Sequence, residues 1–258
     1  MIDGEIPPPL ERFDLTGRVA VVTGGGRGLG RTISLALAAA GARVVAASRK
    51  VEACEEVVAE IQAAGGSALA VGCHMGEPDQ VDALAATARE RFGAIDIVVN
   101  NAATALAFPI GEITPEAFDK SFSVNVRGAL LLTQAALPQL TASPHASVIN
   151  VISVGAYAGA PGMGLYVAGK AALLSLTKTM ARELVGRGIR VNALAPGPFM
   201  TDMVTAGGDA QVQAFAASNP QQRVADPSEI VEAALFLASE ASSFVTGTAL
   251  TIDGGLSA

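Results

Sequence analysis

Short apolar runs alternate along the chain with longer segments in which apolar residues recur at helical spacing. Residues 19–22 and 95–99 are nearly continuous runs of Val, Ile and Ala, which are typical of strands buried on both faces of a parallel sheet. The intervening segments are rich in Ala and Leu. This alternation predicts an α/β fold, with one doubly wound, Rossmann-type parallel sheet of about seven strands and helices on both faces.

The same pattern gives the expected bounds of the elements. We expect strands at residues 18–22, 43–47, 67–71, 95–99, 146–151, 189–193 and 248–252. We expect helices at residues 28–40, 51–64, 78–92, 115–137, 164–185 and 227–238. No linker divides residues 15–258, so they are interpreted as one domain.

Two stretches depart from this rhythm. Residues 1–14 are acidic and rich in proline, which predicts a loose, extended N-terminal extension. Residues 197–223 have a weak helical signal and follow a predicted strand, so we interpret them as a long irregular substrate-binding loop. An ordinary surface excursion is the alternative for this second stretch.

Composition and charge narrow the class of protein. Half of the residues are hydrophobic, 16% are charged, and the net charge is −7. Such a chain can bury a large core, and it lacks the basic stripe of a nucleic-acid binder. With no signal peptide and no membrane span, we expect a soluble, cytoplasmic protein without a membrane partner. Cys54 and Cys73 lack the spacing of metal or redox sites; buried thiols are expected, although a disulfide stays possible, and no metal is expected.

The first strand leads into the glycine-rich turn Thr23-Gly24-Gly25-Gly26-Arg27-Gly28-Leu29-Gly30, which a helix follows. Glycines allow a tight turn, and without Cβ atoms the backbone can approach a pyrophosphate that faces the helix N-terminus. The turn therefore predicts a dinucleotide cofactor. We expect contacts to it from Gly24, Gly26, Arg27, Gly28, Leu29 and Gly30.

The end of the second strand bears on the choice between NAD and NADP. An NAD site usually has an acidic residue there for the ribose 2′-hydroxyl, but this chain reads Ala46-Ala47-Ser48-Arg49-Lys50. Arg49 and Arg27 are two guanidinium groups suited to a 2′-phosphate. We therefore predict NADP(H) in preference to NAD(H), with Ser48 and Arg49 beside the adenosine ribose.

Tyr166 and Lys170 lie four residues apart in a predicted helix, so their side chains project from one face. An ammonium close to a phenol lowers the phenol pKa from its usual value of about 10. Such a phenol can exchange a proton with a substrate oxygen near neutral pH. Tyr166 alone could be a core aromatic and Lys170 alone a surface residue, but their spacing beside a dinucleotide site favours proton transfer coupled to hydride transfer.

These features, together with Asn100-Asn101-Ala102-Ala103 and Ser153, resemble the classical branch of the short-chain dehydrogenase/reductase family. The resemblance covers residues 15–255, and Ser153 precedes Tyr166 by thirteen residues. It implies an enzyme that interconverts an alcohol and a carbonyl compound with a nicotinamide cofactor. It also implies a homo-oligomer, either a dimer or a tetramer.

The resemblance further implies roles for individual residues. Tyr166 would be the general acid and base, and Lys170 would bind the nicotinamide ribose and lower the tyrosine pKa. Ser153 would hydrogen-bond the substrate oxygen, and Asn125 would support a water-linked proton relay. The other implied cofactor contacts, besides Tyr166 and Lys170, are His74, Met75, Asn101, Ala102, Pro196, Gly197, Phe199 and Thr201.

Two positions depart from the family pattern. His74 stands where the family often has Asp near the adenine; its ring nitrogen could accept a hydrogen bond from the adenine amino group, its backbone alone could make the contact, or it has no role. Ala103 replaces the usual glycine, which leaves the local backbone angles open.

The expected pocket walls, residues 104–108, 154–157 and 199–204, are mostly apolar and hold no cluster of Arg or Lys. They favour a neutral, apolar carbonyl compound over a small acid. One alternative is a 3-oxoacyl-thioester reductase, which would need a basic patch to dock a carrier protein. A second is a non-catalytic protein that senses NADP(H) on the same fold.

Overall fold

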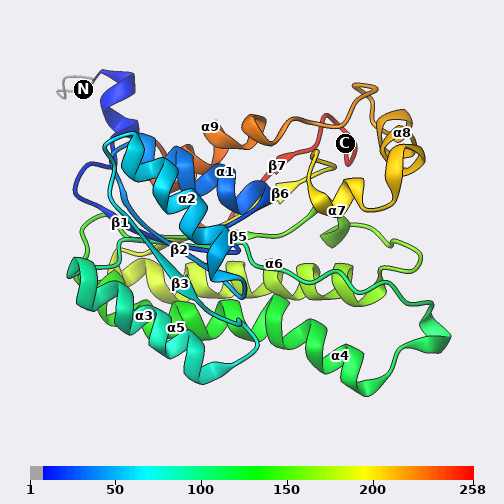
Figure 1. The fold of residues 1–258 in the computed structure, drawn as a ribbon, viewed down its shortest axis with the longest axis horizontal. Coiled ribbons are helices and arrows are strands. Elements are labelled where there is room, and N and C mark those ends of the chain that lie inside the picture. The colour runs from blue at the N-terminus through cyan, green and yellow to red at the C-terminus, as the bar shows by residue number, and fades with distance from the viewer. Residues whose placement is uncertain (1–7) are drawn as a thin grey trace.

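The computed structural model describes residues 8–258 and contains the expected doubly wound parallel sheet (Figure 1). The strand order is β3-β2-β1-β4-β5-β6-β7. The strands are β1 (Val19–Thr23), β2 (Arg43–Ser48), β3 (Ala68–Gly72), β4 (Ile97–Asn100), β5 (Ser147–Val151), β6 (Arg190–Pro196) and β7 (Ala249–Ile252). The predicted fold class and strand number are confirmed.

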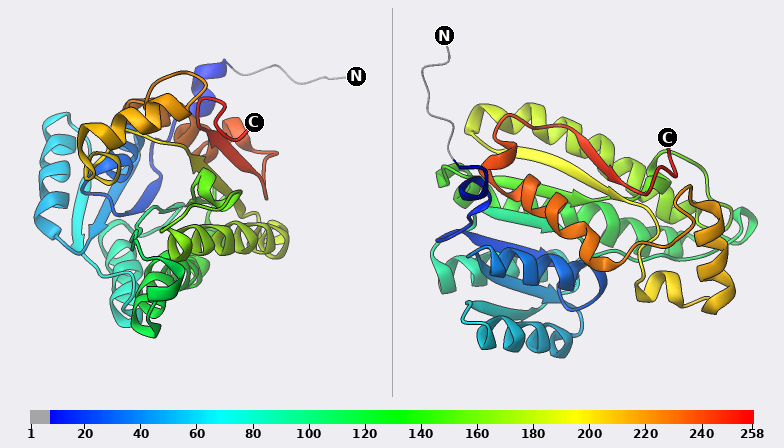
Figure 2. Two further views of the ribbon diagram at one scale, coloured as in Figure 1. Left: turned by 90° about the vertical axis from the view of Figure 1, so that its right-hand side faces the viewer. Right: turned by 90° about the horizontal axis from the view of Figure 1, so that it is seen from above.

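Helices cover both faces of the sheet (Figure 2). On one face lie α1 (Gly28–Ala39), α2 (Val51–Ala63) and α9 (Val231–Ala238), and on the other lie α3 (Pro78–Phe92), α5 (Gly128–Ala142) and α6 (Gly164–Leu184). In β1, Ala20 and Val22 pack toward α1 and α2, whereas Val19 and Val21 pack toward α3 and α5. Because alternate residues of a strand face opposite ways, a strand covered on both sides has to be apolar throughout.

The chain reverses its direction of travel across the sheet after β3. Strands β2 and β3 lie to one side of β1, and β4 returns to its other side. The loops that leave the carboxyl ends of β1 and β4 therefore diverge, and open α/β sheets bind their ligands at such a point. The expected glycine-rich turn follows β1 at this edge.

The helix expected at residues 115–137 consists of three parts. Helix α4 (Pro115–Phe122) continues through the π-helical turn η3 (Ser123–Arg127) into α5, which extends to Ala142. The π turn holds Asn125, and such turns frequently occur at functional sites.

The irregular structure expected for residues 197–223 is wrong in part. This segment contains α7 (Asp202–Thr205) and α8 (Gly208–Ser218). Helix α8 consists largely of Ala and Gln, which favour helices, but none of its residues is fully buried. Without a buried stripe its apolar residues have no clear period, which explains the weak signal.

The extended conformation expected for residues 1–14 is wrong for Pro9–Phe13, which form the 3₁₀ turn η1; residues 1–7 lie outside the described part. Arg12 Nη2 donates to Glu240 O at 2.6 Å and holds η1 against the turn η7 (Glu240–Ser242). The other short turns are η2 (Ile110–Glu112), η4 (Val154–Ala156), η5 (Val185–Arg187) and η6 (Pro227–Ile230).

Cys54 and Cys73 are free and buried, as expected. Within residues 8–258, no group of three or more His, Cys, Asp or Glu side chains has a metal-binding arrangement. In the same residues, no helix has both the length and the apolar character needed to cross a bilayer.

Candidate active site

The glycine-rich turn packs tightly between β1 and α1. A Cβ atom on Gly30 would lie 2.1 Å from the carbonyl oxygen of Gly24 and 2.4 Å from Asn101 Nδ2. Gly24 itself has a φ of 65°, which favours glycine. These contacts explain why the first turn of α1 tolerates no side chain at residue 30.

We expect the substitution Gly30→Ala to lower the free energy of unfolding by about 1–3 kcal/mol, because the added methyl group would overlap a backbone carbonyl. Urea denaturation measures this change. Gly111→Ala is the matched control, since a methyl group there meets no atom within 4 Å. Equal stability of the two variants would contradict the packing described.

The start of α1 fits a dinucleotide phosphate. Residue Arg27, at the N-cap, provides no side-chain hydrogen bond to the first turn, so backbone N–H groups there stay available. A Cβ on Gly28 would approach only Thr201, with the methyl carbon at 3.4 Å and Cβ at 3.6 Å, so a side chain there would fill the space between the turn and Thr201. Open N–H groups beside a glycine are the features that bind a pyrophosphate.

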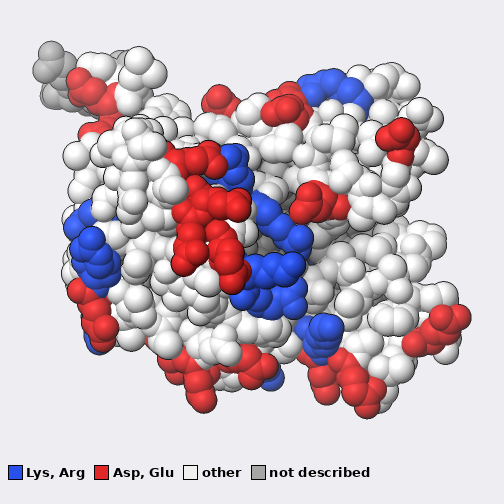
Figure 3. Space-filling view, in the orientation of Figure 1, with Lys and Arg blue, Asp and Glu red and all other residues white. Residues whose placement is uncertain are grey.

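Arg27 and Arg49, the basic residues expected at the ribose, lie at the same carboxyl edge of the sheet. Arg27 Nη1 is 3.4 Å from Asp202 Oδ2, and both side chains are about three-quarters exposed, at 73% and 75%. Arg49 is exposed and has no carboxylate partner within residues 8–258. Ser48 Oγ donates to Lys50 O at 2.6 Å, so its hydroxyl proton is engaged in a hydrogen bond within the protein. Figure 3 shows Lys and Arg side chains together in the middle of this face, beside a column of acidic ones.

Thr23, to which the sequence assigned no role, joins the loops after β1 and β4. Its Oγ1 accepts hydrogen bonds from the backbone N–H groups of Asn101 and Ala102, both at 3.0 Å. Asn101 Nδ2 donates to Thr23 O at 2.8 Å. A single hydroxyl at the end of an apolar strand was the available signal. Ala103 has no left-handed backbone, so its replacement of glycine causes no strain.

Two buried amides, to which the sequence assigned no role, form a polar layer beneath these loops. Asn100 Nδ2 donates to Asn150 Oδ1 at 2.8 Å, and Asn150 Nδ2 donates to Thr177 Oγ1 at 2.8 Å. These bonds join β4, β5 and α6. Asparagines inside otherwise apolar strands were the signal, because a buried amide requires partners.

Tyr166 and Lys170 both lie on α6, next to the end of β5. The Lys170 side chain is 2% exposed, and its Nζ donates to Val151 O at 2.6 Å. The same Nζ is 5.7 Å from the centroid of the Tyr166 ring. Ser153 follows β5, and its Oγ accepts from Gly155 N at 3.1 Å. The structure thus brings together three residues that the sequence singled out.

The lowered tyrosine pKa expected from the sequence is wrong for the protein alone. Burial raises the pKa of Tyr166, and its hydrogen bond with the Ser153 side chain opposes that shift only in part. Burial also lowers the pKa of Lys170 to about 8. The Lys170 ammonium donates to the Val151 carbonyl, and burial disfavours the phenolate as well as the ammonium.

Asn125 is 1% exposed and faces Gly169 of α6, where a Cβ would lie 3.3 Å from Asn125 Cβ. Its Oδ1 accepts from Thr104 N at 2.8 Å, and its Nδ2 donates to Thr104 O at 2.9 Å. The side chain therefore ties the loop after β4 to the π turn. These two bonds leave the amide group engaged in positioning Thr104.

Two other predicted contacts, Met75 and Phe199, have only backbone atoms available. The side chains of Met75 and Phe199 are 6% and 2% exposed and belong to the core, and Leu29 packs against it. A Cβ on Gly197 would lie 2.8 Å from Asp253 Cα, so Gly197 lets the chain pass β7 closely after Pro196.

His74 lies at the carboxyl end of β3. Its neighbour Cys73 donates from its backbone N to Ser48 O at 2.9 Å, next to Arg49. His74 Nδ1 accepts from Gly76 N at 3.0 Å.

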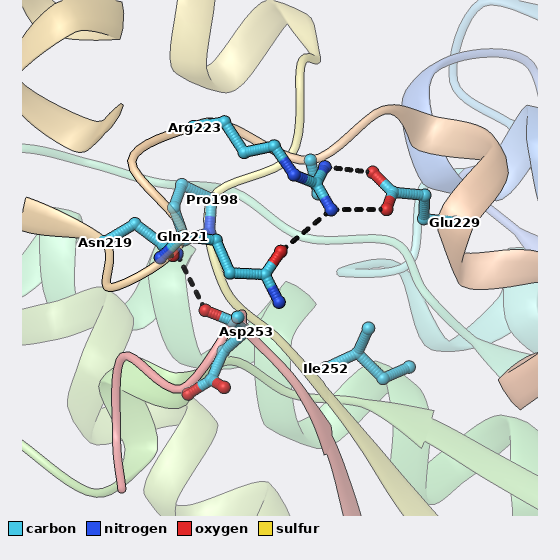
Figure 4. A pocket seen from close by; sticks show the side chains of 9 residues that line it. Pro198, Asn219, Gln221, Arg223, Glu229, Ile252 and Asp253 are labelled. Atoms are coloured by element: carbon cyan, nitrogen blue, oxygen red, sulfur yellow. Dashed lines mark hydrogen bonds and ion pairs between the residues drawn. The ribbon is translucent and has the colours of Figure 1, made fainter. Parts of the chain in front are cut away.

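A cavity of about 140 Å³ lies outside the group formed by Ser153, Tyr166 and Lys170. Figure 4 shows Arg223 in this cavity between Glu229 and Gln221. The Arg223 guanidinium donates twice to Glu229, at 2.6 and 2.7 Å, and once to Gln221 Oε1, at 2.9 Å. Arg223 and Glu229 pair with each other, and the Asp253 carboxylate accepts from Gly255 N and Ser257 Oγ, so the cavity is interpreted as structural support for the chain that follows α8.

Comparison with known proteins agrees with this geometry. The family model described as "Enoyl-(Acyl carrier protein) reductase" matches residues 24–257. A 3-oxoacyl-[acyl-carrier-protein] reductase from Synechocystis is 37% identical over 244 residues, which cover 94% of this chain and 98% of that protein.

Two solved structures are similar over nearly their whole length. A short-chain type dehydrogenase/reductase from Mycobacterium marinum has a TM-score of 0.92 and 35% identity, covering 96% of this chain and 99% of that one. A gluconate 5-dehydrogenase from Burkholderia cenocepacia, in complex with NADP and tartrate, has a TM-score of 0.91 and 36% identity, covering 96% and 98%. Since the family model and these relatives span almost the whole chain, the protein is an oxidoreductase that belongs to the classical branch of the short-chain dehydrogenase/reductase family.

Proposed function

We propose that the protein is an NADP(H)-dependent oxidoreductase that interconverts a ketone and a secondary alcohol, with Tyr166 as the proton donor and acceptor. The observation that carries this proposal is the grouping of Tyr166 with Ser153 and Lys170 near the carboxyl edge of the sheet. The glycine-rich turn at the same edge supports a dinucleotide.

The nicotinamide cofactor supplies the hydride, and the protein's residues orient the groups and move the proton. In carbonyl reduction, the Tyr166 hydroxyl gives its proton to the substrate oxygen, and in alcohol oxidation the phenolate takes it back. The Ser153 hydroxyl hydrogen-bonds the same oxygen. Lys170 would hold the nicotinamide ribose hydroxyls, and its charge stabilises the phenolate left after proton transfer.

The raised pKa of Tyr166 bears on the direction of the reaction. A phenol with a raised pKa stays protonated at neutral pH, which is the form needed for carbonyl reduction. Asn125 acts as a positioning residue, because its amide holds Thr104 beside the π turn.

The expected pocket walls favour a neutral, apolar carbonyl compound. Tyr157 and Met203, which belong to the expected pocket walls, are 46% and 48% exposed, so these walls have accessible apolar surface. A 3-oxoacyl thioester is the second candidate, because the Synechocystis relative is named as a reductase of such a compound. The net charge of −7 weighs against docking of an acidic carrier protein.

A cytoplasmic homodimer or homotetramer is the proposed assembly. Phe118 is 46% exposed and stacks on Phe122, with ring centroids 4.4 Å apart, so α4 presents aromatic surface to a second copy. Helices α4, α5 and α6 are the proposed elements of a two-fold interface.

The test is a screen of carbonyl compounds with NADPH and, in parallel, NADH. The panel contains aliphatic and aromatic ketones, a 3-oxoacyl thioester and a keto acid. Oxidation of NADPH by neutral ketones is the expected result, followed at the nicotinamide absorbance. If the folded protein binds NADPH but turns over no carbonyl compound, the result would favour the sensor alternative.

The cofactor preference makes a separate prediction. We expect Arg49→Ala to weaken NADPH binding by about tenfold or more, because one charge-assisted bond to phosphate contributes about 1.5–3 kcal/mol, and to leave NADH binding nearly unchanged. Binding is measured by titration of cofactor fluorescence. Arg187→Ala, an exposed arginine of η5, is the matched control. Equal losses for the two cofactors in Arg49→Ala would contradict a 2′-phosphate contact.

A further inference from the structure

Helices α7 and α8 form one structural unit, residues 202–218, which we call the α7–α8 unit. The two helices pack against each other, and Gln211 Nε2 of α8 donates to Val204 O of α7 at 3.1 Å. In the described part of the chain, neither helix packs extensively on another helix or strand. Figure 1 shows the two helices together at one end of the molecule.

Backbone hydrogen bonds join the chain segments on either side of this unit. Met200 N donates to Ala225 O at 2.8 Å, and Ala225 N donates to Pro198 O at 3.0 Å. Within residues 8–258, only one side-chain hydrogen bond or ion pair connects the α7–α8 unit to residues outside 199–222, and it joins Asp202 to Arg27. This pair is therefore the polar contact that holds the unit against the glycine-rich turn.

The pair lies at the start of α1, where the phosphates of a dinucleotide are expected. Arg27 is the N-cap of α1, and Asp202 is the first residue of α7. Beside them, a Cβ on Gly28 would lie 3.4 Å from the Thr201 methyl carbon, so the start of α7 closely faces the turn. An anion that reaches Arg27 meets a guanidinium that already has a carboxylate partner. Carboxylate and phosphate oxygens bind the same arginine N–H donors, so the two groups compete.

We propose that Asp202 is an internal competitor for Arg27: its carboxylate holds the guanidinium and the α7–α8 unit in the free protein, and a cofactor phosphate displaces it and releases the unit. The phosphate is either the pyrophosphate common to both nicotinamide cofactors or the 2′-phosphate of NADP(H). This inference rests on the proposed function, because the competing ligand is the proposed cofactor. Asp202 then lowers cofactor affinity and couples it to the position of the α7–α8 unit.

Solvent limits the size of this effect. Both side chains are largely exposed, and an exposed ion pair changes an equilibrium constant by about 1.4- to fivefold. Because coupling between two binding events is reciprocal, the pair weakens cofactor binding by the same factor by which the cofactor weakens the pair. Salt screens exposed charges, so the effect should shrink at high ionic strength.

The first test examines the pair without cofactor. Backbone hydrogen exchange of residues 202–218 is followed by mass spectrometry in the wild type, Asp202→Asn, Arg27→Gln and the double variant. We expect each single variant to exchange about 1.4- to fivefold faster than the wild type, and the double variant to match them, since either change removes the same pair. No acceleration, or equal acceleration by Asp202→Asn in the wild-type and Arg27→Gln backgrounds, would overturn the proposal.

Asp209→Asn is the matched control. Asp209 is the acidic residue in the first turn of α8, is exposed, and has no basic partner within residues 8–258. The change therefore removes the same charge from an equivalent position of the neighbouring helix, without an ion pair. Its hydrogen exchange and cofactor binding should stay close to those of the wild type.

The second test measures the dissociation constants of NADPH and NADH by fluorescence titration. We expect Asp202→Asn to bind NADPH about 1.4- to fivefold more tightly than the wild type, with a smaller gain in high salt. Tighter binding of NADPH alone identifies the 2′-phosphate as the competing group, and tighter binding of both cofactors identifies the pyrophosphate. Unchanged constants for both cofactors, or the same gain in Asp209→Asn, would overturn the proposal.

The two tests separate this inference from the proposed function. A folded wild type that binds neither cofactor would contradict the proposed function and the competition with it, while hydrogen exchange would still decide whether the pair holds the α7–α8 unit. Binding of NADPH by the wild type, with no effect of Asp202→Asn, would overturn this inference alone.

Discussion

Replacing Tyr166 with Phe is expected to lower kcat for carbonyl reduction by about 10²- to 10⁴-fold, the contribution of a positioned general acid. The change removes one oxygen atom and leaves the aromatic ring against α6 and Lys170. NADPH affinity should change little, because the proposed phosphate and adenosine contacts come from other residues. Steady-state kinetics with the best ketone of the screen, together with cofactor titration, measure both quantities.

Tyr157→Phe is the matched control, since the chain has two tyrosines and Tyr157 is 46% exposed. Its kcat should stay within about threefold of the wild type, because loss of an exposed hydroxyl contact changes a free energy by about 0.5 kcal/mol. A Tyr166→Phe variant with unchanged kcat would remove the basis of the proposed mechanism.

Replacing Lys170 with Met is expected to lower activity and to make stability less dependent on pH. Activity should fall by about 10²-fold or more, since a buried charge next to the reacting phenol is lost. Stability should become less dependent on pH. The pKa of Lys170 is lowered by burial from 10.5 to about 8, so between these values the unfolded chain binds more protons than the folded protein.

Stability due to Lys170 is lowest below pH 8, where the folded protein must bury the ammonium, and it rises until about pH 10.5. The rise is about 3 kcal/mol, at about 1.4 kcal/mol for each pH unit. Cys73, whose pKa burial raises to about 11, acts in the opposite direction above pH 9, so the informative quantity is the wild type minus Lys170→Met.

Denaturant unfolding at several pH values measures this difference. Lys178→Met is the matched control, because Lys178 lies on the same helix and is exposed, and its curve should run parallel to that of the wild type. A wild-type curve parallel to that of Lys170→Met would mean that the ammonium is not buried as described.

The features that depend on neighbours along the chain could be predicted from the amino-acid sequence. Continuous apolar strands required a sheet covered on both faces, and a glycine turn between β1 and α1 indicated a phosphate site, since periodicity and dihedral freedom are local properties. The spacing of Tyr166 and Lys170 placed both on one helical face. Helix α8 was not predicted, because none of its residues is fully buried and its apolar residues therefore do not recur at helical spacing.

Which groups meet, and how their surroundings change them, became clear only from the three-dimensional arrangement. Thr23 joins Asn101 from 78 residues away, and Asn125 holds Thr104 across 21 residues, distances over which no local pattern extends. The side chains of Met75 and Phe199 turned out to lie in the core, and Tyr166 to have a raised pKa. Burial and hydrogen-bond partners arise when distant segments pack together, so they set the chemistry of residues whose identity the sequence had already indicated.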